Sequence, residues 1–215
     1  MKLSISLIIG MSGCMAALAN EPSAPPSLNP VETAALQSDT SSEVGTLLMS
    51  GRDCLSSGKW MEAAALLEKA RSLQPANNEV AFVLSAAYIE LKRYADALPM
   101  LESLAKGVPD SPMVKNNLAW VLLHVKDTGG TNMTRAVKLA RAAVLDVPSD
   151  YAIWNTLGEA YYATGRYDKA LQAAESGLRL SVLAGITNSP CRELLVRSRK
   201  AAGAAGLDEM NSDRP

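Results

Sequence analysis

The chain repeats itself at a spacing of 34 residues, and this repeat constrains the fold more than any other feature of the sequence. Pro75 and Pro109 are 34 positions apart, and so are Ala63 and Ala97. Four further pairs have the same offset: Trp60 and Tyr94, Leu67 and Leu101, Ser50 and Leu84, and Cys54 and Tyr88. A repeat of this length is one helix pair that cannot bury its apolar face alone, so the sequence predicts stacked units forming a solenoid.

The third copy carries an insertion, and the fourth copy returns to the original spacing. Ala97 and Ala136 are 39 positions apart, as are Pro109 and Pro148, so residues have been added in a turn that contains the stretch KDTGGTN. From Ala136 to Ala170 the offset is 34 again. The sequence therefore predicts four helix pairs in an array over 43–181. Their approximate ranges are 44–77, 78–111, 112–150 and 151–184.

Small residues and prolines recur at matching places in the copies. One position, on the first helix of each pair, holds Gly51, Ser85, Ala119 and Gly158. Another, on the second helix, holds Ala63, Ala97, Ala136 and Ala170. Small side chains let antiparallel helices approach closely, with larger neighbours filling the gaps beside them. Prolines at 75, 109 and 148 are placed to end each second helix, because proline lacks an amide donor and clashes inside a helix.

The fourth copy resembles the tetratricopeptide repeat family most completely. Its first helix carries the pattern W-x2-L-G-x2-Y at Trp154, Leu157, Gly158 and Tyr161, and Ala170 follows on the second helix. Taken with the other copies, the resemblance covers about residues 44–180. It implies an all-α fold, namely a right-handed superhelical solenoid of about four helix pairs.

The last helix pair needs a cover for its apolar edge, and the C-terminal residues supply one. Ser189-Pro190 is a good helix start, and the following CRELLVRSRKAAGAAG gives a helix with one apolar side and one basic side. We therefore expect a C-terminal capping helix over 189–205. A disordered tail over 206–215 is expected to follow it.

The N-terminal segment has the layout of an export signal. A single Lys precedes an apolar run from Leu3 to Met11, which is shorter than the about 20 residues that a membrane-spanning helix needs. Two processing sites remain open. Cleavage after Ala19 would remove a signal peptide over 1–19, whereas Met11-Ser12-Gly13-Cys14 resembles a bacterial lipobox and would leave an acylated Cys14 after loss of residues 1–13. The protein is expected to be periplasmic or an envelope-anchored lipoprotein, and to reach the membrane only through that lipid.

A stretch rich in Pro, Ser, Thr and Ala follows over 20–42. Its composition cannot bury enough apolar surface to offset the entropy of ordering it, so we expect a flexible spacer. Thr40, with Glu43 three residues later, is a capping box that would open the first helix.

Charge and cysteine content exclude several classes of function. The formal net charge is -1, so there is no excess of Lys and Arg to neutralise a phosphate backbone, and nucleic acid is not expected as a partner. Beyond Cys14 the chain has only Cys54 and Cys191, at opposite ends of the predicted array, and we expect no disulfide between them.

Catalytic and metal-binding patterns are sparse. His124 is the only histidine, which excludes H-E-x-x-H and His-His metal sites, and no C-x-x-C motif is present. We therefore expect no metal and no cofactor. Any Ser-His-acid triad would have to use His124, which is predicted to lie at the end of a first helix.

In tetratricopeptide repeat arrays the first helix of each pair lines the concave face, and the resemblance carries this rule over to each copy. The resulting groove candidates are Leu48, Arg52, Leu55, Phe82, Ile89, Asn116, Trp120, Leu123, Asn155, Glu159 and Tyr162. This set lacks the paired cations of family members that hold a C-terminal carboxylate. Its asparagines suit the backbone amides of a peptide, and its aromatic residues suit the anchors of a helix or peptide.

The resemblance implies a non-enzymatic scaffold that binds a peptide or helix of another protein in a bacterial envelope, in the assembly of a secretion, pilus or surface complex. Two alternatives stay open. One is a self-associating structural protein whose groove holds a second copy. The other is a small hydrolase or transferase that uses His124.

Overall fold

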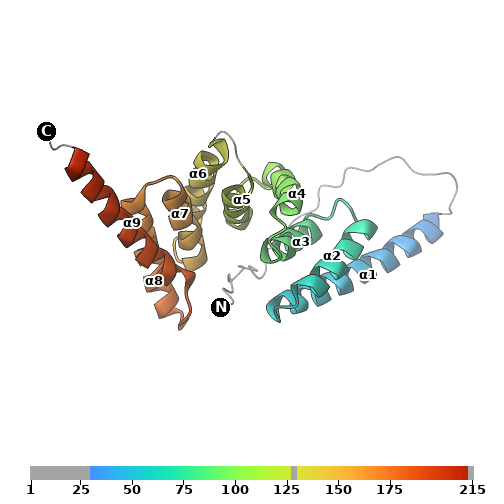
Figure 1. The fold of residues 1–215 in the computed structure, drawn as a ribbon. Coiled ribbons are helices and arrows are strands. Elements are labelled where there is room, and N and C mark those ends of the chain that lie inside the picture. Colours follow the sequence, from blue (N-terminus) through green and yellow to red (C-terminus); the bar gives the residue numbers. More distant parts are fainter. Residues whose placement is uncertain (1–29, 127–129, 213–215) are drawn as a thin grey trace. The chain divides into compact units, whose positions relative to one another are not determined.

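The computed structural model describes residues 30–126 and 130–212, and in this part of the chain every regular element is a helix (Figure 1). In chain order the helices are α1 (Pro30–Ser56), α2 (Trp60–Leu73), α3 (Asn78–Glu90), α4 (Tyr94–Gly107), α5 (Pro112–His124), α6 (Thr131–Asp146), α7 (Tyr151–Ala163), α8 (Tyr167–Leu183) and α9 (Pro190–Ser212). The predicted all-α fold of helix pairs with a further C-terminal helix is confirmed.

Prolines end the second helices where the sequence predicts. The helices α2, α4 and α6 end at Leu73, Gly107 and Asp146, in each case shortly before a proline. The following first helices begin with side-chain caps in the third and fourth copies. Ser111 accepts a hydrogen bond from the amide of Val114 before α5, and Asp150 accepts one from the amide of Ala152 before α7.

Two predicted boundaries differ from the observed ones. Helix α1 begins at Pro30 and runs through Thr40, so the predicted capping box is not a helix start and the predicted spacer is helical from Pro30 onwards. Proline at a first helical position is pre-set for the helix, and neither Gly nor Pro interrupts the chain again until Gly45. At the other end α9 continues to Ser212, through part of the predicted tail. The signal peptide, Cys14 and residues 20–29 lie outside the described residues.

The chain divides into two compact units. The first, which we call the N-terminal unit, contains α1, α2 and α3 as far as Ala87. Helix α2 packs along α1, and the contact is close because Gly51 has no side chain. A Cβ atom at this position would lie 2.7 Å from Cγ of Leu67, which is fully buried. Lys69 and Glu43 join the two helices at their surface with an N–O distance of 2.8 Å.

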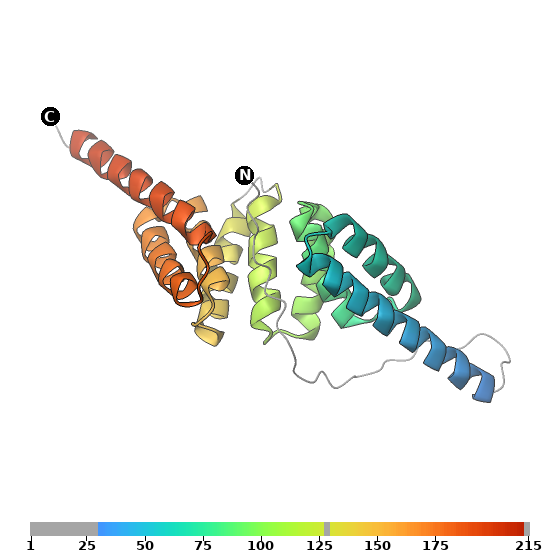
Figure 2. The same ribbon diagram turned by 90° about the horizontal axis from the view of Figure 1, so that it is seen from below.

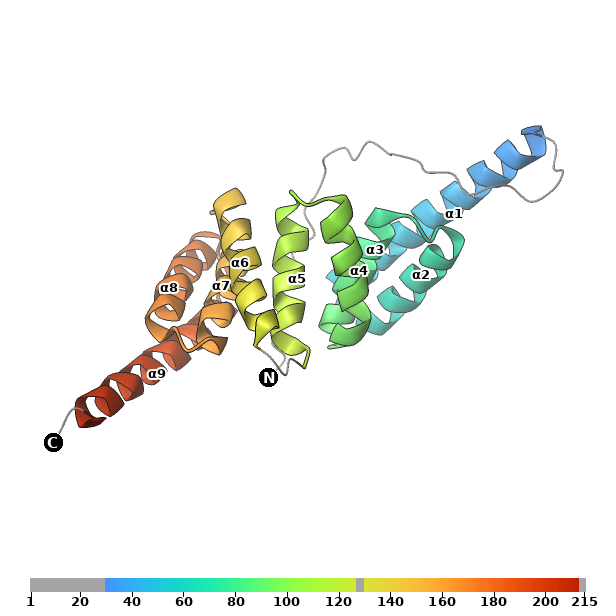
Figure 3. The ribbon, with the colours of Figure 1, turned by 90° about the horizontal axis from the view of Figure 1, so that it is seen from above.

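The C-terminal unit begins at Tyr88 and includes α4 to α9. Successive helices pack on one another from α4 to α9 (Figure 3). Helix α5 also contacts α7, so the first helices of two neighbouring pairs lie together. Fully buried alanines hold the second helices close to the first ones, as the repeat predicts. They are Ala97, Ala136 and Ala170.

Helix α9 packs on both α7 and α8, and its C-terminal part extends beyond them (Figures 1 and 2). Its buried side is formed by Cys191, Leu194 and Ser198, none of which is exposed. Two glycines make room for it. A Cβ atom at Gly158 of α7 would lie 2.5 Å from Cδ2 of Leu194, and one at Gly177 of α8 would lie 2.6 Å from Sγ of Cys191. Helix α9 therefore depends on the absence of side chains beneath it.

Candidate functional site

The predicted groove residues all lie on the first helices of the pairs. The N-terminal unit contains Leu48, Arg52 and Leu55 on α1 and Phe82 on α3. The C-terminal unit contains Ile89 at the end of α3, Asn116, Trp120 and Leu123 on α5, and Asn155, Glu159 and Tyr162 on α7.

In the N-terminal unit only part of the predicted set faces solvent. Leu48 and Leu55 are 7% and 8% exposed, so they belong to the core of this unit and their assignment to an open groove is corrected. Phe82 is half-buried. The guanidinium of Arg52 lies 2.6 Å from a carboxylate oxygen of Glu79, so its charge is already paired within the unit.

In the C-terminal unit, Ile89 is fully buried and is likewise a core residue. Two predicted asparagines are also buried, Asn116 at 8% and Asn155 at 4% exposure. They occupy equivalent positions of α5 and α7, which contact each other. The amide nitrogen of Asn116 donates to Oδ1 of Asn117 at 3.3 Å, but Oδ1 of Asn116 and Oδ1 of Asn155 accept no hydrogen bond from any described residue. Both oxygens are unpaired, but the two side chains are as deeply buried as Leu48 and Leu55, so an incoming donor reaches them only when the side chains turn toward the surface.

Trp120 lies in an aromatic stack beside these asparagines. Its ring centroid is 4.5 Å from that of His124, one turn further along α5, and His124 in turn stacks on Tyr94 of α4 at 4.7 Å. Nδ1 of His124 lies 2.8 Å from the backbone oxygen of Trp120, and in the tautomer that carries a proton there Nδ1 donates to that oxygen. Trp120 is half-buried, so part of its side chain packs against neighbours such as His124 and part stays accessible.

Glu90 is a residue of this region that the sequence did not single out. It ends α3, and burial of its side chain raises the pKa of the carboxyl group to about 7. It is near enough to Tyr94 for its charge to contribute, after burial, to a raised pKa of the phenol. A glutamate at a helix end looks solvent-exposed in a sequence, so no local pattern would have identified it.

Glu159 and Tyr162 of α7 are both in contact with α9. An oxygen of Glu159 lies 2.5 Å from the guanidinium of Arg197, and the same guanidinium lies 4.9 Å from the ring centroid of Tyr162. The ring of Tyr162 also meets Tyr167 edge-on at 5.4 Å. The basic side of the capping helix therefore contributes Arg197 to this surface, a contact that the helix pattern in the sequence does not indicate.

Models of the tetratricopeptide repeat match residues 55–121 and 131–181, which together are more than half of the chain. The chain belongs to the tetratricopeptide repeat family. The two matches leave out the insertion that lengthens the spacing in the third copy, in agreement with its place between α5 and α6.

Solved structures of tetratricopeptide repeat proteins share the fold. The chain is similar to TTC0263, described as a thermophilic TPR protein in Thermus thermophilus, with a TM-score of 0.62, 20% identity, and coverage of 74% of this chain and 83% of that chain. It is also similar to MamA from Desulfovibrio magneticus RS-1, with a TM-score of 0.53, 18% identity and coverage of 75% and 96%. No curated protein sequence gives a significant match.

Membership of the tetratricopeptide repeat family supports a general role as a scaffold for protein–protein interaction, and proteins of this family are typically non-enzymatic. His124 is directed at a backbone carbonyl, and within residues 30–126 and 130–212 no three His, Cys, Asp or Glu side chains gather in a way that would hold a metal. The same residues include no helix long and apolar enough to cross a membrane.

Proposed function

We propose that the protein is a non-enzymatic adaptor of a bacterial cell envelope, and that its C-terminal unit binds an extended peptide segment of a partner protein along α5 and α7. The observation that carries this proposal is the pair of buried amide oxygens on Asn116 and Asn155, which no described residue satisfies. We call the surface formed by these two residues with Trp120, Leu123 and Tyr162 the peptide surface.

An unpaired buried acceptor lowers the stability of the folded chain. Such a group costs about 1–3 kcal/mol relative to a hydrogen-bonded one, and donation from an incoming backbone N–H group recovers that cost on binding. Asn116 and Asn155 occupy equivalent positions of two helices in contact, so their side chains form a short ladder, which we call the asparagine ladder. Two acceptors in a row suit the repeating N–H groups of a peptide backbone better than they suit one side chain of a partner. Recognition of this kind favours an extended peptide.

Apolar side chains beside the ladder supply the contact area. Trp120, Leu123 and Tyr162 are each half-buried, so each has surface to cover without being free to move widely. Aromatic residues held in this way are frequent centres of binding energy at protein interfaces. The charge of Glu159 is neutralised by Arg197, so this end of the surface carries no unpaired acidic group that would repel a peptide carbonyl.

The envelope part of the proposal is supported by the sequence of residues 1–19. The apolar run and the two candidate processing sites are typical of exported bacterial proteins. An adaptor exposed to the periplasm would serve the assembly of a secretion, pilus or surface complex, in which a peptide segment of one component is held while another is added.

A photoreactive amino acid at position 120 tests the peptide surface directly. With Trp120 replaced in the native host, we expect irradiation to link the protein to a defined partner whose linked peptide is identified by mass spectrometry. The matched control carries the same amino acid in place of Leu145, which is 80% exposed on α6. If positions 120 and 145 give the same products, the peptide surface is not a binding site.

A double variant in the same cross-linking experiment tests the asparagine ladder. Replacing both Asn116 and Asn155 with alanine removes the two acceptors and leaves the photoreactive group in place. Loss of two hydrogen bonds of about 1 kcal/mol each predicts a decrease in partner affinity of about tenfold or more. Unfolding measurements check that the variant is folded. Undiminished linking by this variant would contradict backbone recognition by the ladder.

Export predicts a shortened mature protein. From the native host, we expect the intact mass to match either a chain that begins at Asn20 or a chain that begins at Cys14 and carries acyl groups. The two differ by the added lipid and by residues 14–19, so a single measurement separates them. A mass that retains the whole of residues 1–13 without modification would overturn the predicted location.

A further inference from the structure

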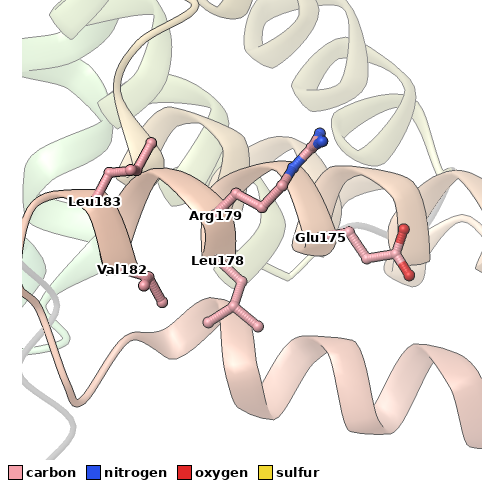
Figure 4. Close-up of a pocket in the computed structure, with 5 residues that line it drawn as sticks. All are labelled: Glu175, Leu178, Arg179, Val182 and Leu183. Atoms are coloured by element: carbon pink, nitrogen blue, oxygen red, sulfur yellow. The ribbon is translucent and has the colours of Figure 1, made fainter.

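The outward face of α8 carries apolar side chains that are largely exposed. Leu183 is 83% exposed and Val182 is 59% exposed, at the end of the last helix of the repeat array. They line a shallow pocket of about 660 Å³ together with Leu178, Glu175 and Arg179, all of which project from α8 (Figure 4). Contiguous exposed apolar surface on a folded domain is typical of an interaction site.

A second observation concerns the order of residues along this face. Leu171, Glu175, Arg179 and Leu183 follow one another at intervals of four residues, so they form one ridge on the helix surface. The ridge lies opposite the buried side of α8, which contains Ala170, Ala173, Ala174 and Gly177. From the N-terminal end of α8 the ridge presents leucine, glutamate, arginine and leucine. In the opposite direction the order is leucine, arginine, glutamate and leucine. The pattern is complementary to its own reversed copy.

We infer that the partner of this face is a second copy of the same chain, bound through α8 in an isologous dimer. A twofold axis at the level of Gly177 makes the two α8 helices antiparallel. Glu175 of each chain then lies opposite Arg179 of the other, and Leu171 lies opposite Leu183 of the other. Ridges of this kind pack at a crossing angle of about 50°.

The charges on this face are available for such a dimer. Glu175 has a contact with Arg199 of α9, but at 3.9 Å and with side-chain exposures of 50% and 69% that pair is a loose surface contact. Within the described part of the chain, the guanidinium of Arg179 reaches only Ser176 on its own helix, at 3.5 Å. A reversed copy of the ridge offers both groups an opposite charge at the centre of an apolar surface. A partner with a uniformly acidic or basic surface would leave one of them repelled.

Helix α9 runs beside this face without covering the ridge: Leu178 and Val182 point toward α9 (Figure 4), and Arg199 of α9 reaches Glu175 at 3.9 Å. It packs through Cys191 and Leu194 against the glycine side of α7 and α8, which is the other side of α8 from the ridge. The dimer surface also shares no residue with the peptide surface of α5 and α7. The inference is therefore independent of the proposed function, and failure of either leaves the other standing.

Charge exchange tests the dimer and its symmetry together. In sedimentation over a wide range of concentrations, we expect the purified full chain to form a dimer reversibly. Glu175→Arg puts Arg opposite Arg at both sites, and Arg179→Glu puts Glu opposite Glu. We expect each variant alone to dimerise about tenfold more weakly or worse. An equimolar mixture of the two variants restores both opposite-charge pairs, so we expect it to regain the dimer.

Controls separate loss of the interface from loss of the fold. Circular dichroism is expected to be unchanged in both charge variants, because the two side chains are exposed. Leu183→Asp is expected to abolish the dimer, and Leu145→Asp, at an equally exposed leucine of α6, to leave it intact. A wild-type chain that stays monomeric at all concentrations would overturn the inference. So would a dimer that survives either charge reversal, or a mixture of the two variants that fails to regain it.

Discussion

Replacement of Gly177 with alanine is expected to destabilise the C-terminal unit by about 2–3 kcal/mol, which is a large fraction of the stability of an ordinary domain. A Cβ atom there would lie 2.6 Å from Sγ of Cys191, 3.1 Å from Cβ of Trp154 and 3.2 Å from the backbone oxygen of Tyr151. Cβ of Trp154 and the backbone oxygen of Tyr151 cannot turn aside, and Sγ of Cys191 belongs to a short side chain that is fully buried. The added methyl group therefore has to push α9 away from α7 and α8.

The measurement is urea-induced unfolding followed by circular dichroism. A matched control is Gly203→Ala, on helix α9 itself, where an added Cβ meets nothing within 4 Å. There the better helix propensity of alanine acts alone, and we expect no loss of stability and a gain of up to about 1 kcal/mol. Equal effects of the two substitutions would show that α9 is not held closely at Gly177.

A compensating substitution tests whether the added methyl group clashes with Cys191. Cys191→Ala removes the nearest atom, so in the double variant with Gly177→Ala we expect the two effects to be non-additive by about 1 kcal/mol in the stabilising direction. Cys191 is fully buried, and burial raises the pKa of its thiol. The residue therefore acts here through its volume.

The docking of α9 also bears on the peptide surface. Arg197 contacts Glu159 and Tyr162 only while α9 is in place. A variant that loosens α9 frees the charge of Glu159 at the end of that surface. We therefore expect amide hydrogen exchange to quicken in α9 of Gly177→Ala, and the substitution to weaken peptide binding without touching the ladder of asparagines.

The helix pairs could be predicted from the sequence because their determinants are local and repeated. Prolines that end helices and small residues that admit a neighbouring helix act through the backbone and through adjacent turns, so a matching offset reveals them. Trp154 illustrates this: it occupies the packing position of the motif, and its indole N–H donates to the backbone oxygen of Pro148 at 2.7 Å. This hydrogen bond ties Trp154 to the loop before α7, so its presence in the sequence needs no ligand to explain it.

The accessible surface could be predicted only in part. The rule that places groove residues on first helices says which side of a helix they occupy, but exposure depends on how many helices crowd that side. Leu48, Leu55 and Ile89 are on the predicted helices and are nevertheless covered. The ends of α1 and α9 were also missed, since the polar composition that suggested flexible chain there permits a helix as well.

The raised pKa of Glu90 could not be predicted from the local sequence pattern, because it arises from burial of the side chain in the folded chain. Its consequence is a stability that depends on pH. Burial raises the pKa of this carboxyl from 4.5 to about 7 in the folded chain. Between those two values the folded state binds more protons than the unfolded state, so stability falls as pH rises through this window. Below it the carboxyl is neutral in both states and the penalty vanishes.

Glu90→Gln keeps the shape of the side chain and removes its charge, so we expect the variant to be more stable than the wild type above pH 7 and equal to it near pH 4. One pKa unit corresponds to about 1.4 kcal/mol, but this side chain is partly open to water, so we expect a gain of about 1–2 kcal/mol rather than the full value. The measurement is the difference between the two unfolding free energies at several pH values, in which the titration of all other groups cancels.

Glu193→Gln, at an exposed glutamate of α9, serves as the control and is expected to give no such rise. A difference for Glu90→Gln that stays constant from pH 4 to pH 8 would mean that the folded chain does not bury this charge, and that the carboxyl beside Tyr94 is solvated like any other.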